Sequence, residues 1–162
     1  MNKIPDFGDK PDYYPVILRT DYSNEETWRA VLQDIAQACG DDTEVSDLCV
    51  VDDPEWAAAE SDDVLNAVRG SEELRGVSVV FIADYATMNP GHHALLAVLT
   101  NSRDDYDDDE SYEWELRFGR EFRTVPRGVA SISANLVTAN MEFVEFSEVA
   151  HHDTEGVYRD SD

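Results

Sequence analysis

The apolar run at residues 77–83 limits the possible folds of this chain more than any other part of its sequence. Only Ser78 interrupts a series of valine, phenylalanine, isoleucine and alanine residues. A short run rich in β-branched residues is typical of a strand, and apolar side chains on both faces are typical of a strand between two layers. Residues 77–83 therefore predict a buried strand inside an α/β sheet.

Helical patterns separate this strand from two earlier strand-like runs. The first helix is expected to begin at a capping-box sequence led by Ser23 and to end at Gly40. A second, shorter helix is expected to be capped by Ser61 and to end at Gly70. The strand-like runs are residues 15–20, 45–51 and 77–83. Strands that alternate with helices favour right-handed crossovers, so this half of the chain predicts a parallel βαβαβ unit.

The second half of the chain predicts a different arrangement. Residues 94–99 form another apolar run, and residues 112–118 alternate between apolar and charged side chains, as a half-exposed strand does. Residues 121–125 are expected to pair with that strand in a hairpin, Pro126 to begin a helix, and residues 156–159 to form a small last strand. We therefore expect a three-layer-like mixed α/β fold, in which an antiparallel edge and one or two C-terminal helices follow the parallel unit.

The length of the chain, 162 residues, fits one domain of ordinary size. Residues 1–14 are rich in proline and aspartate and predict an extended N-terminal lead-in. We expect a single α/β domain over residues 15–159, with an acidic loop at residues 102–112.

The charge balance is strongly acidic and excludes two classes of partner. There are 36 acidic residues and 12 basic ones, which gives a formal net charge of -24. Direct binding of nucleic acid or of an anionic membrane needs clustered Lys and Arg, so neither is expected. Salt adaptation, a GC-rich genome that replaces Lys with Arg, or a surface that binds a basic partner would each produce this balance.

The cysteines and the apolar segments point to the cytoplasm. Cys39 and Cys49 are the two cysteines, and they form neither a disulfide framework nor a zinc-binding pattern. The first ten residues lack the apolar centre of a signal peptide, and the apolar runs are too short to span a bilayer. We expect a cytoplasmic protein.

Four aspartates come directly after predicted parallel strands. They are Asp21, Asp52, Asp53 and Asp84. Ligands of parallel α/β sheets bind beyond the carboxyl ends of the strands, and a divalent cation would relieve the repulsion between carboxylates gathered there. We expect no cofactor for the favoured interpretation, whereas this pattern predicts a Mg²⁺ site as an alternative. No Lys follows a later strand to neutralise a phosphoryl group, so Arg19 or Arg123 would have to replace it.

The most distinctive local feature is an acidic tract that contains three aromatic residues. Its acids would steer a basic surface toward it, and its aromatic side chains would pack after arrival. Trp56, beside another group of carboxylates, is a further candidate anchor. The candidate partner-binding residues are Trp56, Asp104, Asp105, Tyr106, Asp107, Asp108, Asp109, Glu110, Tyr112 and Trp114.

Several ordered motifs resemble those of a family of small bacterial proteins that is described only as a domain of unknown function. These motifs include Arg-Thr-Asp-Tyr-Ser at residues 19–23, Val-Asp-Asp-Pro at 51–54, Phe-Ile-Ala-Asp at 81–84 and Ala-Asn-Met at 139–141. The resemblance covers residues 15–159 and departs from the pattern at residues 102–112, where the acidic stretch looks like a lengthened loop. It implies one domain and supplies no catalytic residues.

These features favour a non-catalytic module that binds a basic protein surface, with the charge character of small immunity or inhibitor proteins. One alternative is a DNA mimic that occupies a DNA-binding groove. The other is a divalent-metal-dependent phosphoryl transferase or hydrolase that uses the four aspartates. No nucleophilic motif of the GxSxG kind and no glycine-rich phosphate loop is present in the sequence, so no catalytic residue is expected.

Overall fold

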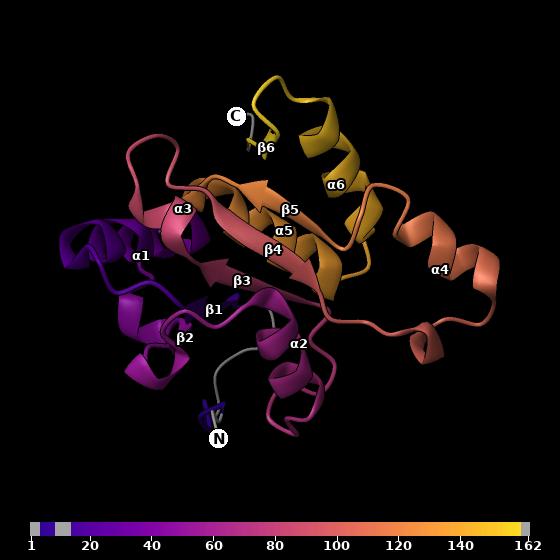
Figure 1. Ribbon diagram of the computed structural model, residues 1–162, viewed down its shortest axis with the longest axis horizontal. Helices are drawn as coiled ribbons and strands as arrows, with labels where there is room; N and C mark the ends of the chain where they lie inside the picture. Colours follow the sequence, from indigo (N-terminus) through magenta and orange to yellow (C-terminus); the bar gives the residue numbers. More distant parts are fainter. Residues whose placement is uncertain (1–3, 9–13, 160–162) are drawn as a thin grey trace.

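A computed structural model describes residues 4–8 and 14–159 of the chain, and its centre is one six-stranded sheet (Figure 1). The strands are β1 (Val16–Arg19), β2 (Cys49–Val51), β3 (Val79–Ala83), β4 (Leu95–Leu99), β5 (Glu121–Thr124) and β6 (Val157–Tyr158). Their order across the sheet is β2-β1-β3-β4-β5-β6. Most of the predicted lead-in lies outside the described residues, but Ile4 and Phe7 pack against the core.

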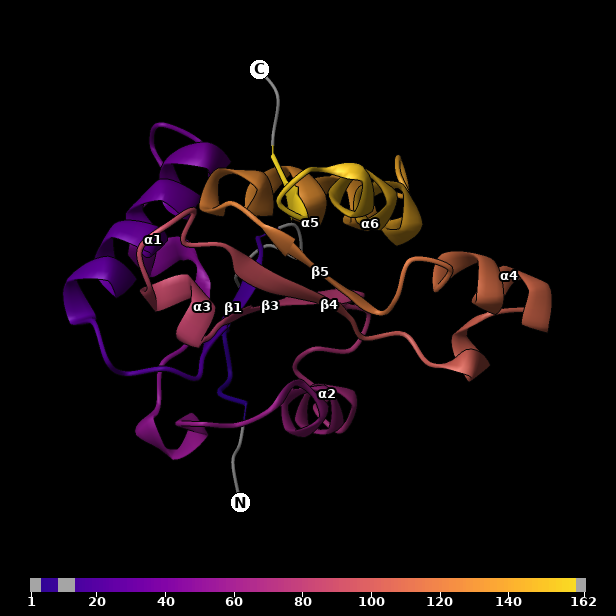
Figure 2. The same ribbon diagram turned by 45° about the horizontal axis from the view of Figure 1, so that its top comes forward.

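Helices cover both faces of the sheet and give the fold three layers (Figure 2). They are α1 (Glu25–Cys39), α2 (Ser61–Arg69), α3 (Tyr85–Met88), α4 (Asp109–Glu115), α5 (Val129–Val137) and α6 (Phe143–His152). On one face, α1, α5 and α6 bury Ile17, Phe81 and Phe122. On the other face, α2 buries Leu18 and Ile82. Because successive residues of β1 and β3 enter opposite cores, residues 16–18 and Val79–Ala83 are all apolar.

The direction of the strands changes in the middle of the sheet. β1 pairs in parallel with both β2 and β3. β4 runs antiparallel to β3 and to β5, whereas the last strand, β6, is parallel to β5. The predicted α/β class, with a parallel unit followed by an antiparallel portion, is therefore confirmed.

The helix starts differ from the predicted ones by one residue. Asn24, not Ser23, caps α1, because its side chain accepts the N–H of Thr27 at 3.0 Å. α2 begins at Ser61 itself, and the preceding Glu60 forms the capping box. The expected ends at Gly40 and Gly70 are confirmed.

The predicted strand at residues 112–118 is wrong. Most of this segment belongs to α4, which Asp108 caps by accepting the N–H of Ser111. The hairpin expected for residues 121–125 is therefore wrong as well, since β5 pairs with β4 and β6. The predicted acidic loop at residues 102–112 contains a turn of 3-10 helix at Arg103–Asp105 and the first part of α4.

None of the helices in the described part of the chain is long and apolar enough to cross a membrane.

Candidate functional site

The four predicted aspartates lie along one edge of the sheet, which we call the rim (Asp21, Asp52, Asp53 and Asp84). Because β2, β1 and β3 are parallel neighbours, the residues that follow them meet at the same edge. The predicted placement on the sheet is therefore correct. The side chains of the rim, however, have separate partners.

Arg19, the last residue of β1, ties together two carboxylates at the rim. Its side chain is 2% exposed. The guanidinium Nη1 lies 2.9 Å from Glu25 Oε2 and 3.5 Å from Asp52 Oδ1. Nε donates to the carbonyl oxygen of Asp21 at 2.9 Å. An arginine in this position neutralises the acids from inside the protein, so their charge is partly compensated.

Aromatic rings enclose the same guanidinium. The Arg19 Cζ atom lies 4.1 Å from the ring centroid of Tyr22 and 5.1 Å from that of Trp28. Trp28 Nε1 donates to Asp52 Oδ2 at 3.1 Å, so α1 also contacts Asp52 directly. Burial, together with the neighbouring Asp52, raises the pKa of the Tyr22 hydroxyl above its ordinary value, so this group stays neutral.

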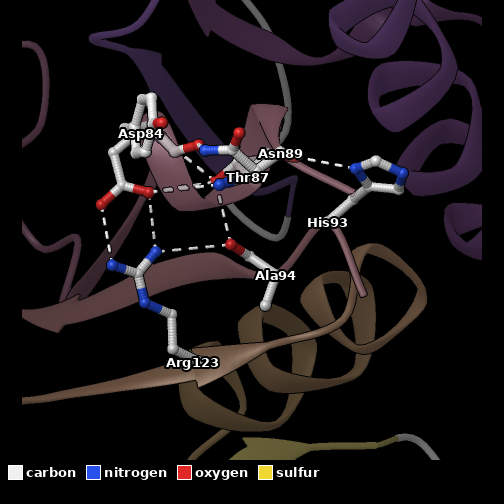
Figure 3. Close-up of polar contacts among 7 residues, drawn as sticks. Asp84, Thr87, Asn89, His93, Ala94 and Arg123 are labelled. Carbon is white, nitrogen blue, oxygen red and sulfur yellow. Dashed lines mark hydrogen bonds and ion pairs between the residues drawn. The ribbon is translucent and has the colours of Figure 1, made fainter. Parts of the chain in front are cut away.

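Asp84 has a different arginine partner. Arg123 on β5 approaches its carboxylate with both terminal nitrogens, at 2.7 Å and 2.8 Å (Figure 3). Burial alone would raise the pKa of Asp84, but Arg123 and hydrogen bonds from Thr87 lower it to a net value below the ordinary one. The pair spans β4 and connects the end of β3 to β5.

Backbone contacts around this ion pair hold the loop between α3 and β4 (Figure 3). The Thr87 hydroxyl donates to the carbonyl oxygen of Ala94 at 2.9 Å, and the carbonyl oxygen of Thr87 lies 2.9 Å from His93 Nδ1. His93 has a φ of 52°, a left-handed backbone that a residue with a side chain rarely adopts. These contacts give Asp84 and His93 structural tasks.

The remaining rim residues accept local hydrogen bonds. Asp21 accepts the N–H of Ser23 at 3.0 Å and also its hydroxyl, and Asp53 accepts the N–H of Glu55 at 3.0 Å. Among the residues described, no three His, Cys, Asp or Glu side chains form a group that could hold a metal ion. The magnesium site at the rim stays a prediction. Arg19 and Arg123, the candidates to neutralise a phosphoryl group, are paired with carboxylates of the protein itself.

Trp56 is not available as a surface anchor. Its side chain is 1% exposed and belongs to the core under α2. A turn of 3-10 helix at Pro54–Trp56 directs the ring inward, beneath the loop that follows β2. The expectation that Trp56 anchors a partner therefore fails, because the ring already fills a place in the core.

The acidic tract lies at the opposite end of the sheet and projects from the body of the protein. We call residues 102–115 the acidic arm. Figures 1 and 2 both show α4 well beyond the end of β4 and the start of β5. Residues 99 and 100 pair with the start of β3 and with the segment before β5, so the chain leaves the sheet there.

Aromatic and polar contacts give the arm a defined structure. The rings of Tyr106 and Tyr112 lie 5.4 Å apart, and Asn101 Nδ2 donates to the Tyr106 hydroxyl at 3.4 Å. Arg103 donates to the carboxylate of Asp109 and, at 2.8 Å, to the carbonyl oxygen of Tyr106. The candidate Tyr106 and Tyr112 are therefore internal supports of the arm.

Glu115, the last residue of the arm, attaches its C-terminal end to the body of the protein. It is 3% exposed, and its Oε1 accepts the N–H of Val144 in the first turn of α6 at 3.2 Å. Burial and the charge of Glu142 raise the pKa of Glu115 above its ordinary value, although the N–H groups at the start of α6 oppose this effect. Sequence patterns did not single out Glu115, because it is one of eight acids within residues 104–115.

Comparison with known protein families identifies the chain. The family described as "Domain of unknown function (DUF6924)" matches residues 14–161. The chain therefore belongs to this family, and the resemblance based on sequence motifs is confirmed. A comparison with curated proteins found no match.

Proposed function

We propose that this member of the DUF6924 family is a non-catalytic interaction module that binds a basic protein surface through its acidic arm. The observation that carries the proposal is a set of exposed carboxylates that have no partner of their own. They are Asp104, Asp107, Glu110 and Glu113. Within the described part of the chain, none of these side chains forms a hydrogen bond or an ion pair.

The rest of the arm acids are less free. Asp105 and Asp108 accept hydrogen bonds within the arm, and Asp109 pairs with Arg103. The backbone and side-chain hydrogen bonds from Ser111 lower the pKa of Asp108 below its ordinary value, so this carboxylate is charged at neutral pH. The supporting acids thus shape the arm, and the unpartnered acids supply its outward charge.

Trp114 supplies an apolar contact beside this charge. Its side chain is 46% exposed on α4, in contrast to the buried Trp28 and Trp56. A half-exposed Trp offers a large contact area and few rotatable bonds, which is why Trp is common at the energetic centres of interfaces. A partner with cationic side chains around an apolar depression would match both features of the arm.

The whole-molecule charge favours the same class of partner. A formal charge of -24 raises the association rate with a cationic protein at low salt and repels nucleic acid. Screening weakens such steering over a distance of about 8 Å at physiological ionic strength. Binding through the arm is therefore expected to be strongly salt-dependent.

An amide NMR titration with a synthetic peptide of arginine and leucine tests the proposal. Shifts are expected to concentrate on residues 104–115 and to disappear at high salt. Trp114→Ala should weaken peptide binding about tenfold, because a partly exposed Trp anchor contributes on that scale. Tyr85→Ala is the matched control, since Tyr85 is 69% exposed on α3 and lies at the rim end of the sheet.

The titration also has an outcome that contradicts the proposal. Shifts spread evenly over the acidic surface, with equal affinities for Trp114→Ala and Tyr85→Ala, would mean that the arm has no special role.

A second experiment distinguishes a DNA-binding groove from another basic protein surface. Duplex DNA is added as a competitor to the complex with a captured basic partner. Loss of binding would favour a DNA-binding groove as the target, and unchanged binding another basic surface.

A further inference from the structure

Two arginines from different parts of the chain bind residues 99–101, which we call the root of the acidic arm. Arg69, the last residue of α2, donates from Nε to the carbonyl oxygen of Thr100 and from Nη2 to that of Asn101, both at 2.9 Å. These bonds join α2 to the segment that leaves β4. The helix α2, which covers one face of the sheet, is thereby connected to the root of the arm.

Arg120, directly before β5, holds the same segment and also the arm itself. Its Nη1 donates to the carbonyl oxygen of Asn101 at 2.7 Å and to that of Leu99 at 3.2 Å. Its Nη2 donates to the Tyr112 hydroxyl on α4 at 2.6 Å. One half-buried guanidinium therefore connects the end of β4 to the helix of the arm.

The choice of acceptor is informative in so acidic a chain. With 36 acidic and 12 basic residues, carboxylates are three times as abundant as cations. Arg69 and Arg120 nevertheless donate to backbone carbonyl oxygens, and Asn101 accepts from both of them. Charged donors form stronger hydrogen bonds than neutral ones, so these contacts fix the position of residues 99–101.

We infer that Arg69 and Arg120 clamp the root of the acidic arm, so that the arm meets its partner as a rigid, preoriented projection. The partner in this inference is the basic protein surface of the proposed function, on which this step rests. Arg69 and Arg120 are positioning residues, since they act on the partner through Asn101 and Tyr112.

Rigidity matters because binding by a flexible segment is opposed by the entropy of ordering it. Each residue that becomes ordered on binding costs conformational entropy, and a preoriented arm avoids that cost. The clamp holds the N-terminal end of the arm, and the buried Glu115 holds its C-terminal end. The acids between these two points are exposed. The arm should thus bind more tightly than the same sequence in a flexible loop.

Backbone NMR relaxation tests the clamp without any partner. In the natural protein, the amides of residues 104–115 should have order parameters of about 0.85, as in rigid backbone, and Arg120→Gln should lower them to below about 0.6. Tyr112→Phe removes only the hydroxyl that accepts from Arg120 and should produce a smaller decrease. Arg29→Gln, an exposed arginine on α1, and Tyr85→Phe are the matched controls and should change nothing.

Peptide affinity tests the consequence for binding. With the arginine and leucine peptide used as probe, Arg120→Gln should bind about tenfold more weakly than Arg29→Gln, because the released arm must be ordered again. Both variants lose one positive charge, so the comparison removes the general electrostatic effect.

Each other outcome has a distinct meaning. An arm that is mobile in the natural protein, or equally rigid in Arg120→Gln, would overturn the clamp. A released arm with unchanged affinity would overturn its role in positioning. If the natural protein does not bind the peptide at all, the proposed function fails, whereas the relaxation data still decide whether the clamp exists.

Discussion

The rim and the acidic arm lie at opposite ends of one sheet, and both owe their prominence in the sequence to aspartate. At the rim, Arg19 and Arg123 pair with carboxylates, and the acids serve to join strands and helices. In the arm, the two arginines at the root donate to backbone oxygens, so most of the neighbouring acids keep an uncompensated charge. The same residue type therefore stabilises the fold at one end and charges the surface at the other.

The difference shows that the position of the arginines, more than the number of acids, separates a structural carboxylate from one available to a partner. Arg103 shows the same effect within the arm, since it pairs with Asp109 and makes that carboxylate a structural one.

Removal of the buried rim arginine should have the largest effect on stability. Arg19→Met keeps much of the side-chain volume between Tyr22 and Trp28 but removes the cation that Glu25 and Asp52 share. Loss of the charged hydrogen bonds to Glu25 and to the carbonyl oxygen of Asp21, together with the contacts to both rings, should lower the free energy of unfolding by about 2 kcal/mol or more. Urea denaturation measures the change, and Arg29→Met, at an exposed site, should stay within about 0.5 kcal/mol. Equal effects of the two substitutions would contradict the structural role of the rim.

Asp84→Asn should have a smaller effect that depends on pH. Loss of the double contact with Arg123 should lower the free energy of unfolding by about 1–2 kcal/mol at neutral pH. Since the folded-state pKa of Asp84 is below its ordinary value, this stabilisation is complete above the ordinary value and is lost as pH falls through the folded one. Denaturation curves of both proteins should converge in acid. A constant difference down to low pH would be inconsistent with the ion pair.

Glu115→Gln should reveal the opposite pH dependence at the arm. The folded-state pKa of Glu115 is above its ordinary value, so the natural protein should gain stability as pH falls through that raised pKa. The glutamine variant lacks this gain. The difference in the free energy of unfolding between the two proteins should therefore be smaller in mild acid than at neutral pH. Stability curves across this range, compared with those of Asp84→Asn, distinguish the two carboxylates by the sign of their slopes. Parallel curves for Glu115→Gln and the natural protein would refute the burial effect.

The smallest effect is expected from magnesium at the rim. Because the rim carboxylates have separate arginine and backbone partners, MgCl2 and KCl at matched ionic strength should raise the melting temperature equally, by screening alone. A saturating extra stabilisation by magnesium that Asp84→Asn abolishes would instead indicate a specific site, because a ligand of the native state stabilises it by mass action. That result would support the alternative function, a divalent-metal-dependent phosphoryl transferase or hydrolase.

The parallel half of the fold could be predicted because its signals are local. The buried strand β3 (Val79–Ala83) has no polar position, and Gly40 and Gly70 end the helices of the parallel half. The arm could not be predicted in the same way, because a few alternating positions at residues 112–118 fit a strand as well as a short helix. The signal for the helix was present in Asp108, a helix-capping residue three positions before Ser111.

The rim could be placed from the sequence, but its chemistry could not. Consecutive parallel strands bring their following residues to one edge, so the position of Asp84 follows from the topology. Its partner Arg123 lies 39 residues away along the chain, on a strand of the antiparallel portion. Contacts of that kind depend on strand order, which no local pattern specifies. The inward direction of Trp56 was hidden for a similar reason, since its core is assembled from distant elements.

The most direct test of the account compares matched charge removal at two places. Asp107→Asn, Glu110→Gln and Glu113→Gln together remove three charges from the arm, and Asp62→Asn, Glu26→Gln and Glu55→Gln remove three exposed charges from other elements. The measurement is the association rate with the arginine and leucine peptide at low salt. The account predicts that the arm variant slows about tenfold or more while the control stays within about twofold. Equal rates for the two variants would show that the arm is only one part of a uniformly acidic surface.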